Sequence, residues 1–284
     1  MPIYEKLNVN KKGTYKSISF KAFDVNMSIS TEEEVLLEEI AQSLHKVFPN
    51  GFEEIDGRHI EHQFSIELKA DDKLDLYRND KLVLNRSTRD GFLDDLGRKL
   101  RVTIAEFAVS KVFLHAGVIS WKGRAIVIPG KSFAGKTSLV AELIKRGALY
   151  YSDEFAILDA DGKVEPYPKM LSLRGIIDDY QQVDYPVESL GGTAGSAIIP
   201  IGMVLITEYR ADETSLKKRE PKILSPGEGI MEILPHTVPL RNKPEFALRV
   251  LNKVASRAII VKILRGEAKE FAAWLLNYYE SVVD

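Results

Sequence analysis

The chain has 284 residues, of which 45% are hydrophobic and 28% charged, the balance of a globular protein with a substantial core. Its formal net charge of −2 gives no indication of nucleic-acid or anionic-membrane binding, and the lack of cysteine excludes disulfides, zinc–thiolate sites and cysteine nucleophiles. There is no secretory signal pattern and no apolar run near the roughly 20 residues of a membrane span, so we expect a cytoplasmic protein.

The first third of the chain alternates between strand and helix patterns. Residues 14–29 alternate apolar and polar side chains, which predicts one or two strands, and residues 31–49 have the apolar spacing of a helix. Strand patterns return over residues 62–86, and a long helical pattern follows over Phe92–Phe113. We therefore predict that residues 1–110 form a small α+β domain, to which the sequence assigns no role.

Residues 111–284 predict a second domain of the α/β class with a mixed sheet. A hairpin is expected around Trp121–Arg124, and Leu149–Leu158 is predicted to be a single strand. Because strands are joined by hairpins as well as crossovers, a plain doubly wound parallel sheet is not expected. Ser189–Ser196 is rich in glycine and predicts a mobile loop. The remaining predicted elements are a buried strand at Met203–Thr207, helices at Pro244–Ser256 and Ala268–Val283, and a strand at Ile259–Leu264.

One stretch of the second domain fits the phosphate-binding P-loop pattern G-x-x-x-x-G-K-[ST]. A strand pattern at Arg124–Pro129 leads into it and a helical pattern from Ser138 follows, which is the context that the motif requires. Glycines let the backbone curl around an anion, and the first N–H groups of the helix point at it. Lys136 would reach the outer phosphates and the Thr137 hydroxyl would hold Mg²⁺. The residues expected to bind nucleotide are Gly130, Lys131, Ser132, Phe133, Ala134, Gly135, Lys136, Thr137 and Ser138.

Two carboxylates follow the apolar run on the first strand after the loop helix. Such a strand usually lies beside the loop strand, so Asp153 and Glu154 are predicted to lie near the metal and the terminal phosphate. One carboxylate there can hold Mg²⁺, and the other can take a proton from an attacking hydroxyl. The plainer alternative is that both are ordinary acidic residues of a turn.

Five more residues are weaker candidates. His115 precedes the loop in an apolar region, where a lone histidine is more often structural, and Arg174 could supply a cation for transferred phosphate. His236 and Arg241 lie in a proline-punctuated stretch that could cover a cleft. Trp121, at the hairpin tip, could stack on an adenine, although a plain turn aromatic is the simpler interpretation.

Taken together, these residues resemble the catalytic domain of the HPr kinase/phosphorylase family, in the phosphoenolpyruvate-carboxykinase-like group of P-loop proteins. The order and spacing of the motifs agree over about residues 112–265, and the first hundred residues carry no match. The matching elements are His115–Val118 before the loop, Lys145–Gly147 at the end of its helix, Asp153 with Glu154 on the next strand, and Leu173–Gly175.

The resemblance implies a fold like that of the family's C-terminal domain and transfer of the γ-phosphate of ATP to a hydroxyl. Asp153 would be the base, Lys136 would neutralise phosphate charge, and Thr137 with Glu154 would hold Mg²⁺, while His115 would support the reacting groups. The acceptor would be a serine of a protein or peptide, or a small hydroxylated molecule. A ring-shaped homo-oligomer is also implied.

The chain departs from the family at several positions, and two other functions remain open. Ser172 replaces a glutamate thought to help with metal, Glu154 replaces the second aspartate, and residues 176–180 differ from the family's glycine-containing version. These changes leave ATP binding in place but favour an acceptor other than HPr. Ser172 also motivates the alternative of a nucleotide-binding regulatory or assembly protein with little phosphotransfer. A third possibility is a motor- or transporter-type ATPase using Glu208, although a transporter signature is missing.

Overall fold

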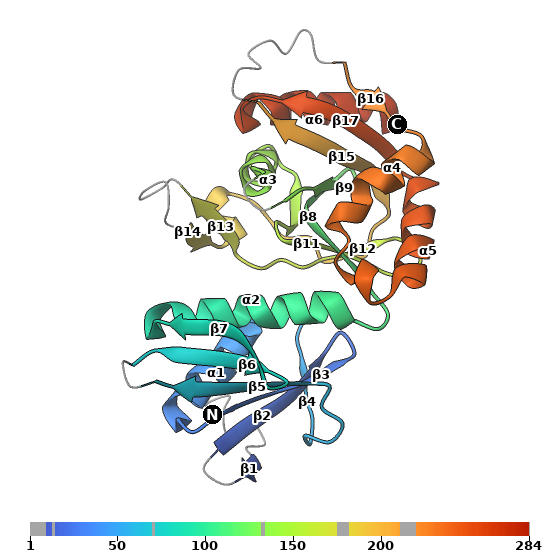
Figure 1. Ribbon diagram of the computed structural model, residues 1–284. Coiled ribbons are helices and arrows are strands. Elements are labelled where there is room, and N and C mark those ends of the chain that lie inside the picture. The colour runs from blue at the N-terminus through green and yellow to red at the C-terminus, as the bar shows by residue number, and fades with distance from the viewer. Residues whose placement is uncertain are drawn as a thin grey trace. The chain divides into compact units, whose positions relative to one another are not determined.

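The computed structural model describes residues 10–12, 15–69, 72–131, 134–174, 182–210 and 220–283. The chain divides into two compact units, residues 1–110 and 111–284 (Figure 1). No helix in the described part of the chain combines the length and the apolar character that crossing a membrane requires.

The first unit is a mixed sheet covered by two helices. Strand order is β1-β2-β3-β5-β6-β7 with β4 paired to β2, and β3 and β5 are parallel while the other neighbours are antiparallel. Helix α1 packs on β2 and β3, helix α2 packs on β6 and β7, and the two helices contact each other. The elements are β1 (Asn10–Lys12), β2 (Tyr15–Ala22), β3 (Val25–Thr31), α1 (Glu34–Val47), β4 (Glu53–Glu54), β5 (His62–Leu68), β6 (Leu74–Arg78), β7 (Lys81–Ser87) and α2 (Arg89–Phe107).

The alternating pattern of the first unit is confirmed, but its last helix is shorter than predicted. On β3, Val25, Met27 and Ile29 are buried and the residues between them are half-buried, as period-two alternation requires. The helix predicted to run to Phe113 ends at Phe107. Val112 and Phe113 instead begin a strand, where they pair with the strand formed by residues 155–158. Long-range pairing therefore overrides a helical apolar pattern at this boundary.

The second unit contains an eight-stranded mixed sheet and a separate two-stranded ribbon, β13-β14. The order of the large sheet is β12-β11-β8-β9-β15-β17-β16, and β10 also pairs with β8. The elements are β8 (Val112–Trp121), β9 (Arg124–Pro129), α3 (Lys136–Ile144), β10 (Leu149–Ser152), β11 (Phe155–Leu158), β12 (Val164–Glu165), β13 (Leu171–Arg174), β14 (Gln182–Tyr185), η2 (Val187–Leu190), β15 (Ile201–Tyr209), β16 (Lys222–Ile223), α4 (Pro226–Ile233), η4 (Leu234–His236), η5 (Val238–Arg241), α5 (Pro244–Ala255), β17 (Ile259–Arg265) and α6 (Ala268–Val283).

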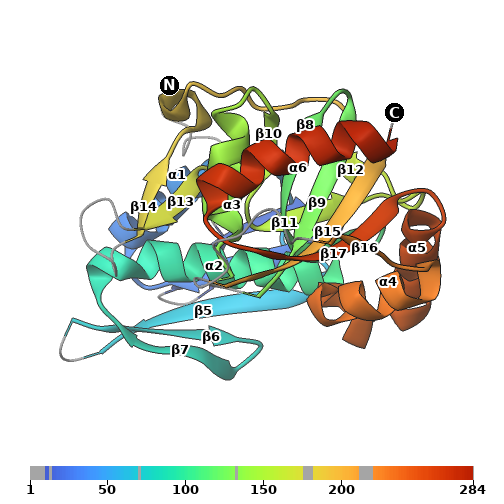
Figure 2. The same ribbon diagram turned by 90° about the horizontal axis from the view of Figure 1, so that it is seen from above.

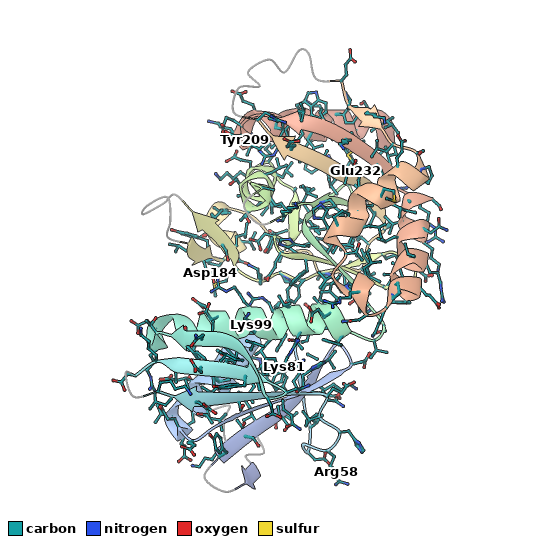
Figure 3. The ribbon with its side chains drawn as sticks, in the orientation of Figure 1. Arg58, Lys81, Lys99, Asp184, Tyr209 and Glu232 are labelled. Atoms are coloured by element: carbon teal, nitrogen blue, oxygen red, sulfur yellow. The ribbon has the colours of Figure 1, made fainter. Side chains whose placement is uncertain are left out.

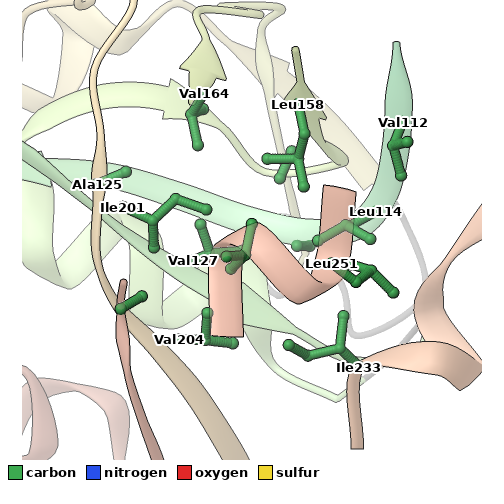
Figure 4. Close-up of a cluster of buried hydrophobic side chains, with 14 of the residues drawn as sticks. Val112, Leu114, Ala125, Val127, Leu158, Val164, Ile201, Val204, Ile233 and Leu251 are labelled. Carbon is green, nitrogen blue, oxygen red and sulfur yellow. The ribbon is translucent and has the colours of Figure 1, made fainter. Parts of the chain in front are cut away.

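Both faces of the large sheet are buried, each by a different pair of helices. Helices α3 and α6 pack against each other on one face (Figure 2). Side chains of α4 and α5 cover the other, where Leu251 and Ile233 join Val112, Leu114 and Val127 of the strands (Figure 4). Burial on both faces explains why β8 and β9 are almost continuously apolar.

Two predictions for the second unit require correction. The strand predicted over Leu149–Leu158 is interrupted, so that Asp153 and Glu154 lie in the break between β10 and β11. The glycine-rich stretch predicted to be a mobile loop is hydrogen-bonded to β10, because Tyr150 N–H donates to Thr193 O at 2.9 Å and Gly195 N–H donates to Tyr150 O at 2.8 Å. The predicted strands at 203–207 and 259–264 and both C-terminal helices are confirmed.

Candidate functional site

The glycine loop, residues 130–135, connects the carboxyl end of β9 to the first turn of α3. The predicted strand and helix on either side of the loop are therefore confirmed. Gly130 N–H donates to His115 O at 3.2 Å, which fixes the start of the loop to β8. Gly135 has a φ of +72°, a left-handed conformation that favours glycine. Ser132 and Phe133, which were predicted to bind nucleotide, lie outside the described residues.

Helix α3 approaches the sheet closely beside this loop. A Cβ atom on Gly117 of β8 would lie 2.7 Å from Cγ2 of Val140, so only glycine fits there without a shift. The first turn of α3 contains Lys136, Thr137 and Ser138, whose N–H groups belong to the helix N-terminus and have no partner within a helix ladder. This turn is where a helix presents amides and a positive dipole end to an anion.

Lys136 folds back over the glycine loop. Its Nζ donates to the carbonyl oxygens of Gly130 and Lys131, both at 2.8 Å, and only 7% of the residue is exposed. Burial lowers the pKa of Lys136 to about 8, and the nearby Asp153 and Glu154 partly oppose that shift. The ammonium group thus lies against the carbonyls of the glycine loop, and the negative charges of two nearby acidic side chains favour its protonated form.

The acidic pair, Asp153 and Glu154, reaches the loop by a different route from the one predicted. Strand β10 lies beside β8, and the parallel neighbour of the loop strand β9 is β15. The acidic pair nevertheless comes close to the glycine loop, because β9 and β10 both run antiparallel to β8 and are therefore parallel to each other. Their carboxyl ends consequently reach the same edge of the sheet, where ligands bind in open α/β folds.

The carboxylate of Asp153 contacts four neighbouring groups. Its Oδ2 accepts from Thr137 Oγ1 at 3.2 Å and from Ser172 N–H at 3.3 Å. Its Oδ1 accepts from the Tyr150 hydroxyl at 3.1 Å and lies 3.0 Å from Lys169 Nζ. Burial and the charge of Asp153 raise the pKa of Tyr150, so its hydroxyl stays protonated and donates. Four donors therefore hold one carboxylate at the first turn of α3.

Glu154 also lies near the ammonium group of Lys169. Its Oε2 lies 3.9 Å from Lys169 Nζ, and its backbone N–H donates to Ser152 Oγ at 3.2 Å, which shapes the turn between β10 and β11. Ser172, on β13, adds an oxygen on the other side, since it accepts from Lys169 Nζ at 3.3 Å and donates to Asp184 at 2.6 Å (Asp184 is labelled in Figure 3).

Two histidines lie within the electrostatic reach of Lys136. Burial, together with the charges of Lys136 and His236, lowers the pKa of His115 to about 4. His236 also has a lowered pKa, first from burial and then from Lys136 and Lys131. The segment carrying His236 is brought in by a bridge between Leu114 and Thr237. Both imidazoles are therefore neutral near pH 7.

Other predicted site residues fall elsewhere. Trp121 is at the opposite end of β9 from the glycine loop, roughly 20 Å away at about 3.3 Å per residue, and its Nε1 donates to Glu280 at 2.9 Å. This position agrees with the simpler interpretation of Trp121 as a turn aromatic. Glu208, considered for water activation, is exposed and pairs with Arg210 at 2.8 Å. The backbone of Arg174 belongs to β13, but its side chain lies outside the described residues, so its role stays a prediction.

The sequence interpretation missed Lys169 and Arg265. Arg265 ends β17, and its Nη2 donates to the carbonyls of Ala134 at 2.9 Å and Gly135 at 3.1 Å. Because β9, β15 and β17 are parallel, the carboxyl end of β17 lies at the same edge as the glycine loop, but the sequence pattern does not contain this strand order. Lys169 lies in an irregular stretch, where spacing carries no signal.

Comparisons with known proteins add one finding. The sequence matches no protein-family profile, and no curated protein gives a significant match. The structure is similar to one described as "Structure of the Hpr(Ser) kinase/phosphatase from Coxiella burnetii", with a TM-score of 0.34 and 13% identity, over 60% of this chain and 94% of that one. A similarity of this size assigns no residue role or activity to the present chain.

Proposed function

We propose that the second unit binds ATP at the glycine loop and transfers its γ-phosphate to a hydroxyl. The observation that carries the proposal is the 3.2 Å hydrogen bond from Thr137 to Asp153, which joins the first turn of α3 to a buried carboxylate in the break between β10 and β11. A phosphate held by the loop amides and Lys136 would lie beside that carboxylate. Phosphoryl transfer needs this juxtaposition of an anion cradle with a group that positions the nucleophile.

The oxygens present fit a divalent cation that is shared with nucleotide phosphates. Within the described ranges, no three His, Cys, Asp or Glu side chains gather into a metal cage. Magnesium is commonly held by one or two carboxylates together with phosphates and water, so a cage is not required. Thr137, Asp153 and Glu154 would hold Mg²⁺, which would neutralise phosphate charge.

The roles of the protein groups follow from their chemistry. Asp153 takes the proton of the acceptor hydroxyl, whose oxygen forms a bond to the γ-phosphorus as the bond to the ADP oxygen breaks. Lys136 exchanges its two carbonyl partners for phosphate oxygens. His115 is neutral and can therefore hydrogen-bond near the transferred group without adding charge.

Labelled ATP tests this proposal directly. Wild type and Asp153→Asn are incubated with γ-labelled ATP, Mg²⁺ and HPr, free serine or serine peptides, with Asp161→Asn as the control because that acid is exposed and paired with Lys253 at 2.9 Å. We expect label on an acceptor with wild type and Asp161→Asn, and at least a 100-fold loss with Asp153→Asn. Equal transfer by wild type and Asp153→Asn would remove the basis of the proposal.

One observation favours a second function. All four donors of Asp153 are in place, so a substrate hydroxyl must replace one of them before the carboxylate can act as a base. If those donors remain bound to Asp153, the protein would bind nucleotide without transferring phosphate, as a regulatory or assembly module does. ATP binding that requires Lys136, without labelled acceptor or ADP, would establish that function instead.

A further inference from the structure

The ammonium group of Lys169 lies among oxygen atoms. Its Nζ is 3.0 Å from Asp153 Oδ1 and 3.9 Å from Glu154 Oε2. It also donates to Met170 O at 3.0 Å and to Ser172 Oγ at 3.3 Å. The lysine side chain is only 11% exposed, against 3% for Asp153 and 19% for Glu154. Lys169 therefore contacts both acids of the site.

The backbone holds Lys169 in this place. Its N–H donates to Tyr167 O at 2.9 Å, and its carbonyl oxygen lies 2.8 Å from the buried Tyr150 hydroxyl, whose single proton is shared between this carbonyl and Asp153. Tyr167 N–H in turn donates to Tyr151 O at 2.8 Å, which ties the segment to β10. Hydrogen bonds thus fix the backbone of Lys169, while its flexible four-carbon side chain carries the ammonium group to the acidic pair.

The surroundings of this ammonium suit a divalent cation equally well. Carboxylate, hydroxyl and carbonyl oxygens are the ligands that Mg²⁺ and Mn²⁺ prefer. Two cations cannot share the position, because like charges a few ångströms apart repel strongly where water is largely excluded. A metal ion can therefore use the acidic pair only if Lys169 leaves it.

We propose that Lys169 is a resident cation that competes with the divalent metal for Asp153 and Glu154. The lysine keeps metal affinity low in the free protein, and metal arriving with nucleotide displaces it because the phosphates supply further ligands. The inference rests on the proposed function only in assuming that a divalent metal binds here. Metal binding is measurable without phosphotransfer, so the competition between Lys169 and the metal can be disproved independently of the proposed kinase activity.

Direct Mn²⁺ binding tests the competition. Free Mn²⁺ is measured by electron paramagnetic resonance during titration of wild type, Lys169→Met and Lys253→Met, without nucleotide. Lys253 is the control because it is another ion-paired lysine of the same unit. We expect Lys169→Met to bind at least 10-fold more tightly and Lys253→Met to match wild type. Unchanged or weaker binding by Lys169→Met would overturn the proposal, as would the absence of Mn²⁺ binding in both.

A measurement on the unaltered protein decides the matter even if Lys169→Met does not fold. The lysines of wild type are acetylated briefly with acetic anhydride at increasing Mn²⁺ in the presence of ATP, and each site is quantified by mass spectrometry. Displacement of Lys169 predicts that its labelling rises several-fold over the range in which Mn²⁺ binds, while Lys253 labelling stays constant. Constant labelling of Lys169 over that range contradicts displacement, whether or not any acceptor is phosphorylated.

Discussion

Arg265, at the carboxyl end of β17, hydrogen-bonds to the carbonyl of Gly135 in the glycine loop. Arg265 is 3% exposed, and its guanidinium lies 5.2 Å from the ring centre of Tyr209, at the end of β15 (Tyr209 is labelled in Figure 3). In a trans peptide the C=O and N–H groups point in opposite directions. The Gly135 carbonyl and the Lys136 N–H belong to the same peptide group. Because the carbonyl points toward Arg265, the N–H points away from Arg265, where it is free to face a bound anion.

Replacing this arginine is expected to weaken nucleotide binding. Arg265→Met removes the charged donors to two loop carbonyls, at a cost of about 1.5–3 kcal/mol for each such hydrogen bond. We expect ATP affinity, measured by isothermal titration calorimetry, to fall at least tenfold. The matched control is Arg257→Met, whose Nη1 donates to Asp161 O at 3.1 Å. Equal affinity in the two variants would mean that Arg265 does not position the loop.

Gly135→Ala is expected to destabilise the second unit through two separable effects. Its φ of +72° costs a non-glycine residue about 1–2 kcal/mol. A Cβ atom there would also lie 2.3 Å from Arg265 Nη2, so the guanidinium must shift and lose its hydrogen bonds to the loop carbonyls, at a cost of about 1.5–3 kcal/mol for each. Gly147→Ala is the control, because Gly147 has a φ of +93° and nothing within 4 Å of its Cβ position. Urea unfolding should show the larger loss for Gly135→Ala, and equal losses would exclude the clash.

The pH dependence of ATP binding should report Lys136. The pKa of this lysine is about 8 in the free protein, and bound phosphates must raise it because they favour the charged ammonium. Binding then takes up a proton above pH 8, so affinity falls as pH rises through that value. Calorimetric affinities between about pH 7 and 9.5 should show the decline. Lys136→Arg, which stays charged, should show a flat profile, and a flat wild-type profile would contradict the assignment.

Stability at acid pH should depend on His115. Its pKa is about 4 in the folded protein and near 6.5 when unfolded, so between these values the unfolded state binds the extra proton. Stability should therefore fall as pH drops from about 6.5 toward 4. Allowing for partial exposure of the ring, the loss is of the order of 1–2 kcal/mol. His115→Gln should lose less stability than wild type between pH 7 and 5, and parallel losses would count against this prediction.

Much of the second unit follows from local sequence patterns. The strand 124–129, the glycine loop and the helix from Lys136 are adjacent in the chain, so short-range rules locate them. The meeting of Thr137 with Asp153 was predicted from the ends of the strands, although the strand order behind that prediction was wrong, because β10 pairs with β8 and not with β9.

Features that depend on long-range pairing were not predictable in this way. The end of α2 and the break between β10 and β11 are set by pairing with other strands. Tyr150, Lys169 and Ser172 converge on Asp153 from segments whose contacts no periodic pattern encodes. The rule that places Asp153 applies to Arg265 as well, but it requires the strand order, which hydrophobic spacing does not contain.

Trp121, which is hydrogen-bonded to Glu280, and the other tryptophan of the chain make it possible to follow the unfolding of one unit by fluorescence. The chain has two tryptophans, Trp121 and Trp274, and both belong to residues 111–284. Trp274 stacks on Tyr278 with ring centres 4.9 Å apart. Indole emission will therefore follow the melting of the second unit alone, whereas far-ultraviolet circular dichroism will follow both. Comparing the two signals in one experiment separates the stabilities of the two units without cutting the chain.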